Sequence, residues 1–483
     1  MKAFVAALLL LAAGFARAQA IGYEGARHLL NRAGFGATDV EVREYAPLDR
    51  LQAVERLLRD TRREAAIAPP AFVDEPFLPY YKLRQMSAQD RVAARRELFL
   101  QGLELRAWWL REMLLTPSPL TERMTLFWHG HFATSQQKVR ASQLMYRQNV
   151  LLRREALGNF ATLLHAVAKD PAMLVYLDNA GSRRQAPNEN FAREVMELFT
   201  LGEGRYAEQD VKEAARAFTG WSLDRDSGEY TFRRLWHDGG EMTVLGTTGR
   251  LDGDEVIDIL LARPETARFV AAKLWREFIS PRPDVAQTQR LAAVFRDSRY
   301  EVKPLLRAIL LSDDFWSMEN RASLIKSPVD LIVGTLRTFE LHPLDLRPAV
   351  LAVAALGQNL FSPPNVRGWP GGDAWINSST LLGRKQWLDR VFRGADAMAM
   401  MAAAPERETG PQGRGEDARL RRAIEGAMSG YAVDVPRWQK TLASPAQRER
   451  LLLAQPPVNP VSHAVEEADF VRGLVADPAY QLR

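Results

Sequence analysis

The sequence contains no cysteine. Disulfide bonds, thiolate metal sites and a lipid-modified N-terminal cysteine are therefore excluded. After the N-terminal region the sequence also lacks any long apolar run, and a spanning helix needs about 20 apolar residues, so we expect no transmembrane anchor. A basic block with interleaved aromatic residues is absent too. The net charge of +5 therefore does not indicate a nucleic-acid partner.

Several catalytic signatures are missing as well. The sequence has no HExxH zinc helix, no GxSxG nucleophile elbow and no GxxxxGK[ST] phosphate loop. It shows no internal repeat at a fixed period. Any chemistry must therefore come from residues that folding brings together from separate motifs.

The first twenty residues have the pattern of a secretory signal peptide. Lys2 precedes an apolar run over residues 3–16, and small residues follow at Ala16, Ala18 and Ala20. No arginine pair precedes the run, which excludes the twin-arginine route. We expect a Sec-type signal peptide over residues 1–20, cleavage after Ala18 or Ala20, and a periplasmic or secreted protein.

Apolar residues at helical spacing dominate the rest of the chain and predict a mainly α fold, a multi-helix globular array. One exception is a small β-hairpin near residues 221–236, with a turn at Asp226-Ser227-Gly228. A single long helix is predicted over residues 140–168. The predicted organisation has a helical main domain over 21–403, a flexible linker over 404–416 that lacks apolar periodicity, and a C-terminal helical segment over 417–483.

Two histidines one residue apart form the first candidate site, His129 and His131 in Phe127-Trp128-His129-Gly130-His131-Phe132. In a helix, side chains at i and i+2 point about 200° apart. In extended chain they lie on one side. The apolar stripe ends just before Gly130, which predicts that the helix stops near Trp128. His129 and His131 could then bind one divalent metal ion or act in acid–base catalysis. Alternatively, one imidazole could form a hydrogen bond with a buried carbonyl while the other faces water.

An acidic helix supplies the second set, after Asn188 as its N-cap. Asn190, Glu194 and Glu197 fall at i, i+4 and i+7 and form one polar stripe. Glu194 and Glu197 could ligate a metal together with the histidines or hold a proton, with Arg193 setting the local charge. Alternatively, these acids and Arg193 form ordinary ion pairs on the helix.

Two further segments carry candidate residues. His237 and Asp238 follow the predicted hairpin and could add metal ligands, or they could form a plain turn. Residues 361–375 are rich in proline and glycine. In this loop Arg367, Trp369 and Trp375 could stack against a sugar or aromatic ligand, or the tryptophans could fill the core.

Together these motifs resemble a bacterial exported family described as domain of unknown function 1800, from about residue 25 to about residue 395. The stretches that carry the resemblance are 28–36, 127–132, 188–202, 206–221, 237–239, 326–328 and 363–372. The resemblance implies a mainly helical exported protein of unsettled activity. It also implies a partner, a neighbour-encoded exported protein that resembles the alkaline phosphatase superfamily. Phe199 stands where this family commonly has histidine, and Glu241 where it commonly has lysine.

Two functions follow from these motifs. The first is an exported enzyme with a His/carboxylate site that uses a metal ion or acid–base chemistry. The alternative is a periplasmic binding or assembly protein, in which the polar motifs form a structural network and the loop at 361–375 contacts a partner or a glycan. Glycan hydrolysis by Glu194 and Glu197 is a weaker third hypothesis, because two carboxylates one turn apart on a helix are badly placed to flank a scissile bond. The sequence does not specify the oligomeric state.

Overall fold

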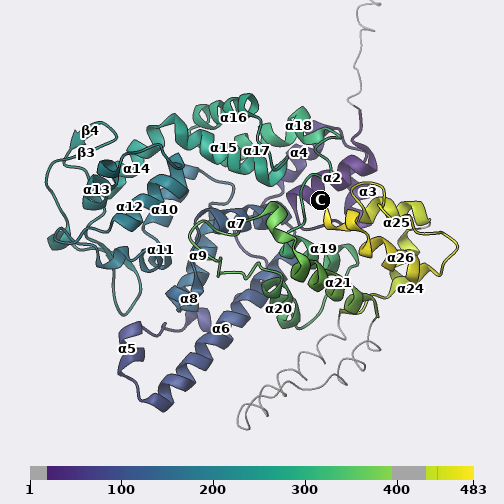
Figure 1. The fold of residues 1–483 in the computed structure, drawn as a ribbon, viewed down its shortest axis with the longest axis horizontal. Helices are drawn as coiled ribbons and strands as arrows, with labels where there is room; N and C mark the ends of the chain where they lie inside the picture. The colour runs from purple at the N-terminus through teal and green to yellow at the C-terminus, as the bar shows by residue number, and fades with distance from the viewer. Residues whose placement is uncertain (1–18, 394–430, 443) are drawn as a thin grey trace, which may run out of the picture.

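A computed structural model describes residues 19–393, 431–442 and 444–483. The described residues form a mainly α protein, as predicted, with helices packed around a shared core (Figure 1). The predicted linker at 404–416 lies outside the described residues, as does all of the predicted signal peptide except Gln19 and Ala20. Within the described ranges, no helix combines the length and the apolar character needed to cross a bilayer.

The N-terminal helices begin with side-chain caps that are visible in the sequence. Thr38 and Asp49 each accept a hydrogen bond from the backbone of the following turn and complete a capping box. A long helix then projects from the body, together with a short one (Figure 1). The elements of this part are α2 (Gly22–Ala33), α3 (Asp39–Tyr45), α4 (Arg50–Arg59), η1 (Ala71–Asp74), α5 (Tyr80–Gln85) and α6 (Ala88–Leu115).

The centre of the molecule contains helices that were predicted only in part. The single helix predicted over 140–168 is wrong, because Asn159 starts a new helix by accepting hydrogen bonds from the backbone of Ala161 and Thr162. The central elements are α7 (Pro119–His131), α8 (Gln136–Val139), α9 (Ser142–Arg154), α10 (Phe160–Ala168), α11 (Pro171–Tyr176) and η2 (Asn179–Gly181).

The predicted hairpin is present. Strand β1 (Trp221–Leu223) pairs antiparallel with β2 (Tyr230–Phe232). A second pair in the same stretch of chain, β3 (Met242–Val244) with β4 (Thr247–Gly249), was not predicted, and Figure 1 labels it in the lobe at the left. The helices of this lobe are α12 (Glu189–Met196), a π-helical turn η3 (Glu197–Leu201), α13 (Glu208–Ala217), η4 (Arg234–Trp236) and α14 (Gly253–Ala262).

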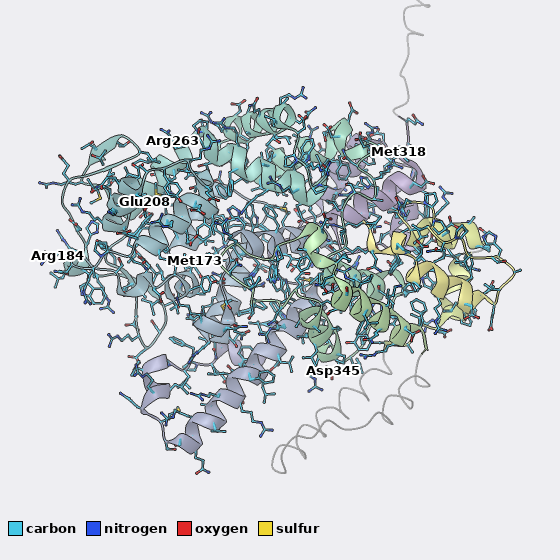
Figure 2. All side chains as sticks on the ribbon, in the orientation of Figure 1. Met173, Arg184, Glu208, Arg263, Met318 and Asp345 are labelled. Carbon is cyan, nitrogen blue, oxygen red and sulfur yellow. The ribbon has the colours of Figure 1, made fainter. Side chains whose placement is uncertain are left out.

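The remaining helices form the top and the right of the view in Figure 1, and the C-terminal segment packs against them. Trp438 donates a hydrogen bond from Nε1 to the carbonyl of Thr338, and Tyr431 donates to the carbonyl of Asp345, which Figure 2 labels. Both aromatic rings belong to the same hydrophobic core as the main body. The elements are α15 (Pro264–Phe278), α16 (Val285–Asp297), α17 (Val302–Leu311), α18 (Asp313–Trp316), α19 (Pro328–Thr338), α20 (Arg347–Ala355), η5 (Gly372–Trp375), α21 (Ser378–Arg393), α24 (Val435–Trp438), η7 (Gln439–Thr441), α25 (Pro445–Leu452), α26 (Glu467–Ala476) and η8 (Pro478–Gln481).

Candidate functional site

Helix α7 does not end at Trp128 but continues through His131. The prediction that the chain opens at Gly130 is therefore wrong. Along a helix, His129 and His131 point about 200° apart, so they cannot chelate one metal ion as predicted. The two imidazoles face different surroundings, one in the interior of the protein and one at the wall of a pocket.

His129 belongs to a buried polar network and is 2% exposed. Asn149 donates from Nδ2 to His129 Nε2 at 3.0 Å, and Arg153 donates to Asn149 Oδ1 at 2.6 Å. The guanidinium fixes the orientation of the amide, so His129 Nε2 is an acceptor and Nδ1 carries the proton. Burial, aided by the charge of Arg153, lowers the pKa of His129 to about 3. His129 is a neutral structural residue here.

His131 contacts two groups that use both of its ring nitrogens. Nε2 lies 3.1 Å from the carbonyl oxygen of Phe199, which can only accept, so Nε2 carries the proton. Nδ1 accepts a hydrogen bond from Lys273 Nζ at 3.0 Å. Burial and the charge of Lys273 lower the pKa of His131. Because each nitrogen already has a partner, this imidazole offers no free lone pair to a metal.

The acidic helix begins at Asn188 as predicted, and its side chains separate into two groups. Arg193 forms a two-pronged ion pair with Glu208 of α13, at 2.7 Å for each contact, while Asn190 is exposed. Figure 2 labels Glu208 in the lobe at the left. Arg193 therefore forms a surface ion pair with a neighbouring helix, not the pairs along its own helix that the alternative interpretation expected.

Glu194 and Glu197 lie on the side of α12 and η3 that faces the loop at 361–375. Glu197 accepts hydrogen bonds from the Tyr206 hydroxyl and, at 3.1 Å, from Arg367 Nη2. Partial burial and the charge of Glu197 raise the pKa of Glu194. Glu197 thus pairs with Arg367, and within the described residues neither carboxylate forms a hydrogen bond with His129 or His131.

His237 and Asp238 are held by other groups. His237 Nδ1 donates to the carbonyl of Thr219 at 3.0 Å. Asp238 accepts from Arg216 at 2.8 Å and from the backbone of Gly240, and the bond from Arg216 lowers its pKa. His237 and Asp238 therefore bond to neighbouring residues of the same lobe and do not join the histidines of α7.

The predicted metal-ligand set does not come together. Among the residues that the structure describes, no three His, Asp or Glu side chains lie close enough to hold one metal ion. What folding does bring together is His131, Arg367, Trp369 and Trp375, which all line one pocket of about 450 Å³. Its other lining residues are Arg123, Leu126, Phe127, Gly130, Lys273, Arg276, Glu277, Pro281, Leu324, Ile325, Ser327, Asp330, Gln358, Pro370, Gly371, Gly372 and Arg483.

This pocket, the basic pocket, has more positive than negative side chains. Asp330 and Glu277 are its acidic residues. Both contact Arg123 and Arg483, with Arg483 Nη2 2.8 Å from Glu277 Oε1 and a direct hydrogen bond between Arg123 and Asp330. Burial alone would raise the pKa of Asp330, but the two guanidinium groups hold it well below its usual range.

The positive charge that no carboxylate of the pocket neutralises comes from Arg276 and Lys273 on α15. Arg276 is exposed and, within the described part of the chain, makes no hydrogen bond or ion pair. Lys273, one turn earlier on the same helix, has His131 and a backbone carbonyl as partners and, among the described residues, no carboxylate. Trp369 Nε1 and Arg483 Nη1 are buried N–H donors without an acceptor among the described residues. The pocket therefore presents positive charge, which suits an anion.

Sequence reasoning missed the residues that give the pocket its charge. Arg123 is one turn before Phe127 on α7, and Lys273 and Arg276 fall at i and i+3 on an otherwise amphipathic helix. That polar pair beside the apolar face of α15 was the available signal. Arg483 gave no signal at all, because its approach to Glu277 and Asp330 depends on how the C-terminal segment packs.

Comparison with family models identifies the chain. The model described as protein of unknown function (DUF1800) matches residues 28–482, so the chain belongs to this family. The match extends well beyond residue 395, where the resemblance in the sequence was expected to end. Comparison with curated proteins gives no match, and comparison with solved structures gives none either.

Proposed function

We propose that this protein is an exported bacterial binding protein that takes a small anionic ligand, carrying a carboxylate or phosphate, in the basic pocket. The observation that carries the proposal is the unpaired guanidinium of Arg276 at a pocket whose two carboxylates are already engaged by Arg123 and Arg483. A volume of about 450 Å³ suits a sugar-sized molecule. Export is inferred from the N-terminal segment.

The pocket favours a binding role over the predicted His/carboxylate enzyme. His129 is enclosed in the interior, and Glu197 is engaged by Tyr206 and Arg367. The loop at 361–375 instead supplies Arg367, Trp369 and Trp375 to the pocket wall. Indole rings and guanidinium groups together suit a ring that bears a negative charge. This is the contact role that the sequence offered for the loop.

The decisive experiment compares a charged ligand with its neutral counterpart. Calorimetric titration of the mature protein at low salt should show binding of methyl β-D-glucuronide and much weaker binding of methyl β-D-glucoside. Arg276→Glu should lower the glucuronide affinity by about tenfold or more, since a hydrogen bond to a charged group contributes about 1.5–3 kcal/mol. The affinity should also fall as salt is added.

A matched control lies on the same helix. Arg268 is exposed on α15 and pairs with Glu265 at 2.7 Å, outside the pocket. Arg268→Glu makes the same change of charge and should leave the affinity nearly unchanged. Equal binding of both glycosides, or wild-type affinity in Arg276→Glu, would show that the pocket does not select an anion.

Export and the partner have separate tests. N-terminal sequencing of protein from the periplasmic fraction should begin at Gln19 or Ile21, and an intact Met1 would contradict export. The neighbour-encoded protein resembling the alkaline phosphatase superfamily should co-purify with this chain if the implied partnership is real.

A further inference from the structure

Lys273 occupies an unusual position for a lysine at the wall of a pocket. Its Nζ donates to His131 Nδ1 at 3.0 Å and to the carbonyl oxygen of Leu198 at 3.3 Å. Among the described residues no carboxylate lies within ion-pair distance of it. Glu277, one turn further on α15, is already paired with Arg123 and Arg483. The amine therefore faces neutral acceptors and lines the basic pocket.

These surroundings lower the pKa of the Lys273 amine. Burial, aided by the positive charge of Arg276, lowers its pKa to about 7, whereas an ordinary lysine has a pKa near 10.4. Near neutral pH a large share of this side chain is the neutral amine. A neutral amine in a partly apolar pocket beside another cation is the activated form that attacks carbonyl groups.

The tautomer of His131 provides a proton acceptor at the amine. Its Nε2 proton is fixed by the carbonyl of Phe199, so Nδ1 presents a lone pair directly to Lys273 Nζ. The basic side chains Arg276, Arg367, Arg123 and Arg483 line the same pocket and would hold the negative end of a ligand. Amine, proton acceptor and anion-binding groups thus share one space.

We propose that Lys273 forms an imine with a small anionic aldehyde or 2-oxo acid in the basic pocket. This proposal rests on the anion binding proposed above and narrows the ligand to a carbonyl compound. The Nζ lone pair forms a bond to the carbonyl carbon, and the π electron pair moves to oxygen. The proton lost by nitrogen passes to His131 Nδ1 and then to that oxygen. The second nitrogen proton passes to the resulting hydroxyl by the same route, so the hydroxyl leaves as water while the nitrogen lone pair forms the C=N bond. No oxidant or reductant is needed.

Reductive trapping tests the imine directly. The full-length mature protein is incubated at pH 7 with glyoxylate and sodium cyanoborohydride, and the products are followed by intact mass and peptide mapping. We expect one carboxymethyl group per chain, on Lys273, at an initial rate about tenfold or more above that of exposed lysines, whose pKa near 10.4 keeps them protonated. Equal labelling of Lys273 and the exposed Lys212 would overturn the proposal.

Lys326 is a matched internal control. Burial lowers its pKa to about 7 as well, but its Nζ lies over the ring of Tyr480, at 3.7 Å from the ring centroid, and it does not line the pocket. Slow labelling of Lys326 supports a role for the pocket. Labelling of Lys326 as fast as Lys273 would mean that a low pKa alone explains the reaction and would overturn the proposal.

The two proposals can fail separately. Lys273→Arg removes the nucleophilic amine, so the carboxymethyl product should disappear from the peptide at position 273. Anion binding is measured separately on the wild type with methyl β-D-glucuronide, which has no free carbonyl. Wild-type protein that binds the glucuronide but traps no glyoxylate at Lys273 refutes the imine and leaves anion binding intact. Wild-type protein that does neither refutes both.

Discussion

Arg153 and Glu122 form a two-pronged ion pair in the interior of the protein, with each side chain only 1% exposed. Arg153 Nε and Nη2 lie 2.6 and 2.9 Å from the two oxygens of Glu122. Trp109 donates to the same carboxylate, and Asn149 links Arg153 to His129. Half of the predicted His-x-His site is thus one end of a satisfied polar network that joins α6, α7 and α9.

Removing the charge of Glu122 should strongly destabilise the fold. Glu122→Gln keeps the shape but leaves the Arg153 guanidinium without a buried counter-charge, which costs about 3–5 kcal/mol. Urea unfolding measures this loss. Glu229→Gln is the control, because the Arg147–Glu229 pair is largely exposed and such pairs contribute about 0–1 kcal/mol. A loss in Glu122→Gln no larger than in Glu229→Gln would contradict the importance of the network.

His129 should make the protein less stable in mild acid. Its pKa is about 3 in the folded protein and about 6.5 in the unfolded chain, so below pH 6.5 the unfolded state takes up a proton that the folded state refuses. The contribution of His129 is full above pH 6.5 and is lost as the pH falls towards 3. Between pH 6.5 and pH 5 the loss is about 2 kcal/mol.

His129→Gln isolates that contribution, because glutamine still offers an acceptor to Asn149. The free energy of unfolding is measured for both proteins at pH 7 and pH 5. The wild type should lose about 2 kcal/mol more than the variant. Buried His28 acts in the same direction, and buried Asp170, whose pKa is raised to about 7, acts in the opposite one. Both are present in each protein and cancel in the comparison, so equal losses would refute the role of His129.

The sequence predicted some helix boundaries correctly from a capping residue or a proline. Pro119 fixes the start of α7, and Asn188 caps α12 as its position predicts. The break at Asn159 carried a local signal as well, since Gly158 and Asn159 stand together, but apolar periodicity on both sides concealed it. Gly130 led to the opposite error, because the sequence predicted a helix end near it and α7 continues through His131. Tertiary packing around Trp128 and His129 keeps α7 helical where glycine alone favours an end.

The basic pocket was much harder to predict from the sequence than the helices were. Of the predicted residues, those in the loop at 361–375 reach the pocket together with His131. The positive side chains of the pocket come from distant segments, since Arg123, Lys273 and Arg483 lie 150 residues or more apart along the chain, and the unpaired charge is that of α15. No periodicity or spacing relates such distant residues, because only the packing of α7, α15 and the C-terminal segment sets their separation. The histidine and carboxylate motifs that stood out in the sequence have structural roles, since His129 belongs to a buried polar network and Glu197 pairs with Arg367.

Gly368 should tolerate no side chain, because the loop at 361–375 lies directly on the end of α7. Its φ is +84°, and a Cβ there would overlap the carbonyl oxygen of Gly130. Gly371 has a φ of +69° but open space around it. Both alanine variants carry backbone strain of about 1–3 kcal/mol, and Gly368→Ala adds the overlap. Thermal unfolding should therefore give a clearly lower Tm for Gly368→Ala, and equal Tm values would contradict this contact.

The indoles of Trp369 and Trp109 should respond differently to substitution by phenylalanine. Trp109 Nε1 donates to Glu122 Oε2 at 2.9 Å, so Trp109→Phe leaves a buried carboxylate short of a donor and should cost about 1.5–3 kcal/mol. Trp369 Nε1 has no acceptor within the described residues, so Trp369→Phe removes an unsatisfied donor at little cost in stability.

Binding should show the reverse order. Trp369 lines the basic pocket, so we expect its indole ring to contact the ligand and Trp369→Phe to weaken the binding of methyl β-D-glucuronide about threefold or more. Trp109 lies outside the pocket, so Trp109→Phe should bind normally below its unfolding temperature. Urea unfolding and calorimetric titration of the same two variants separate the roles. If Trp369→Phe instead loses stability and keeps full affinity, its indole belongs to the core and the ligand is recognised without it.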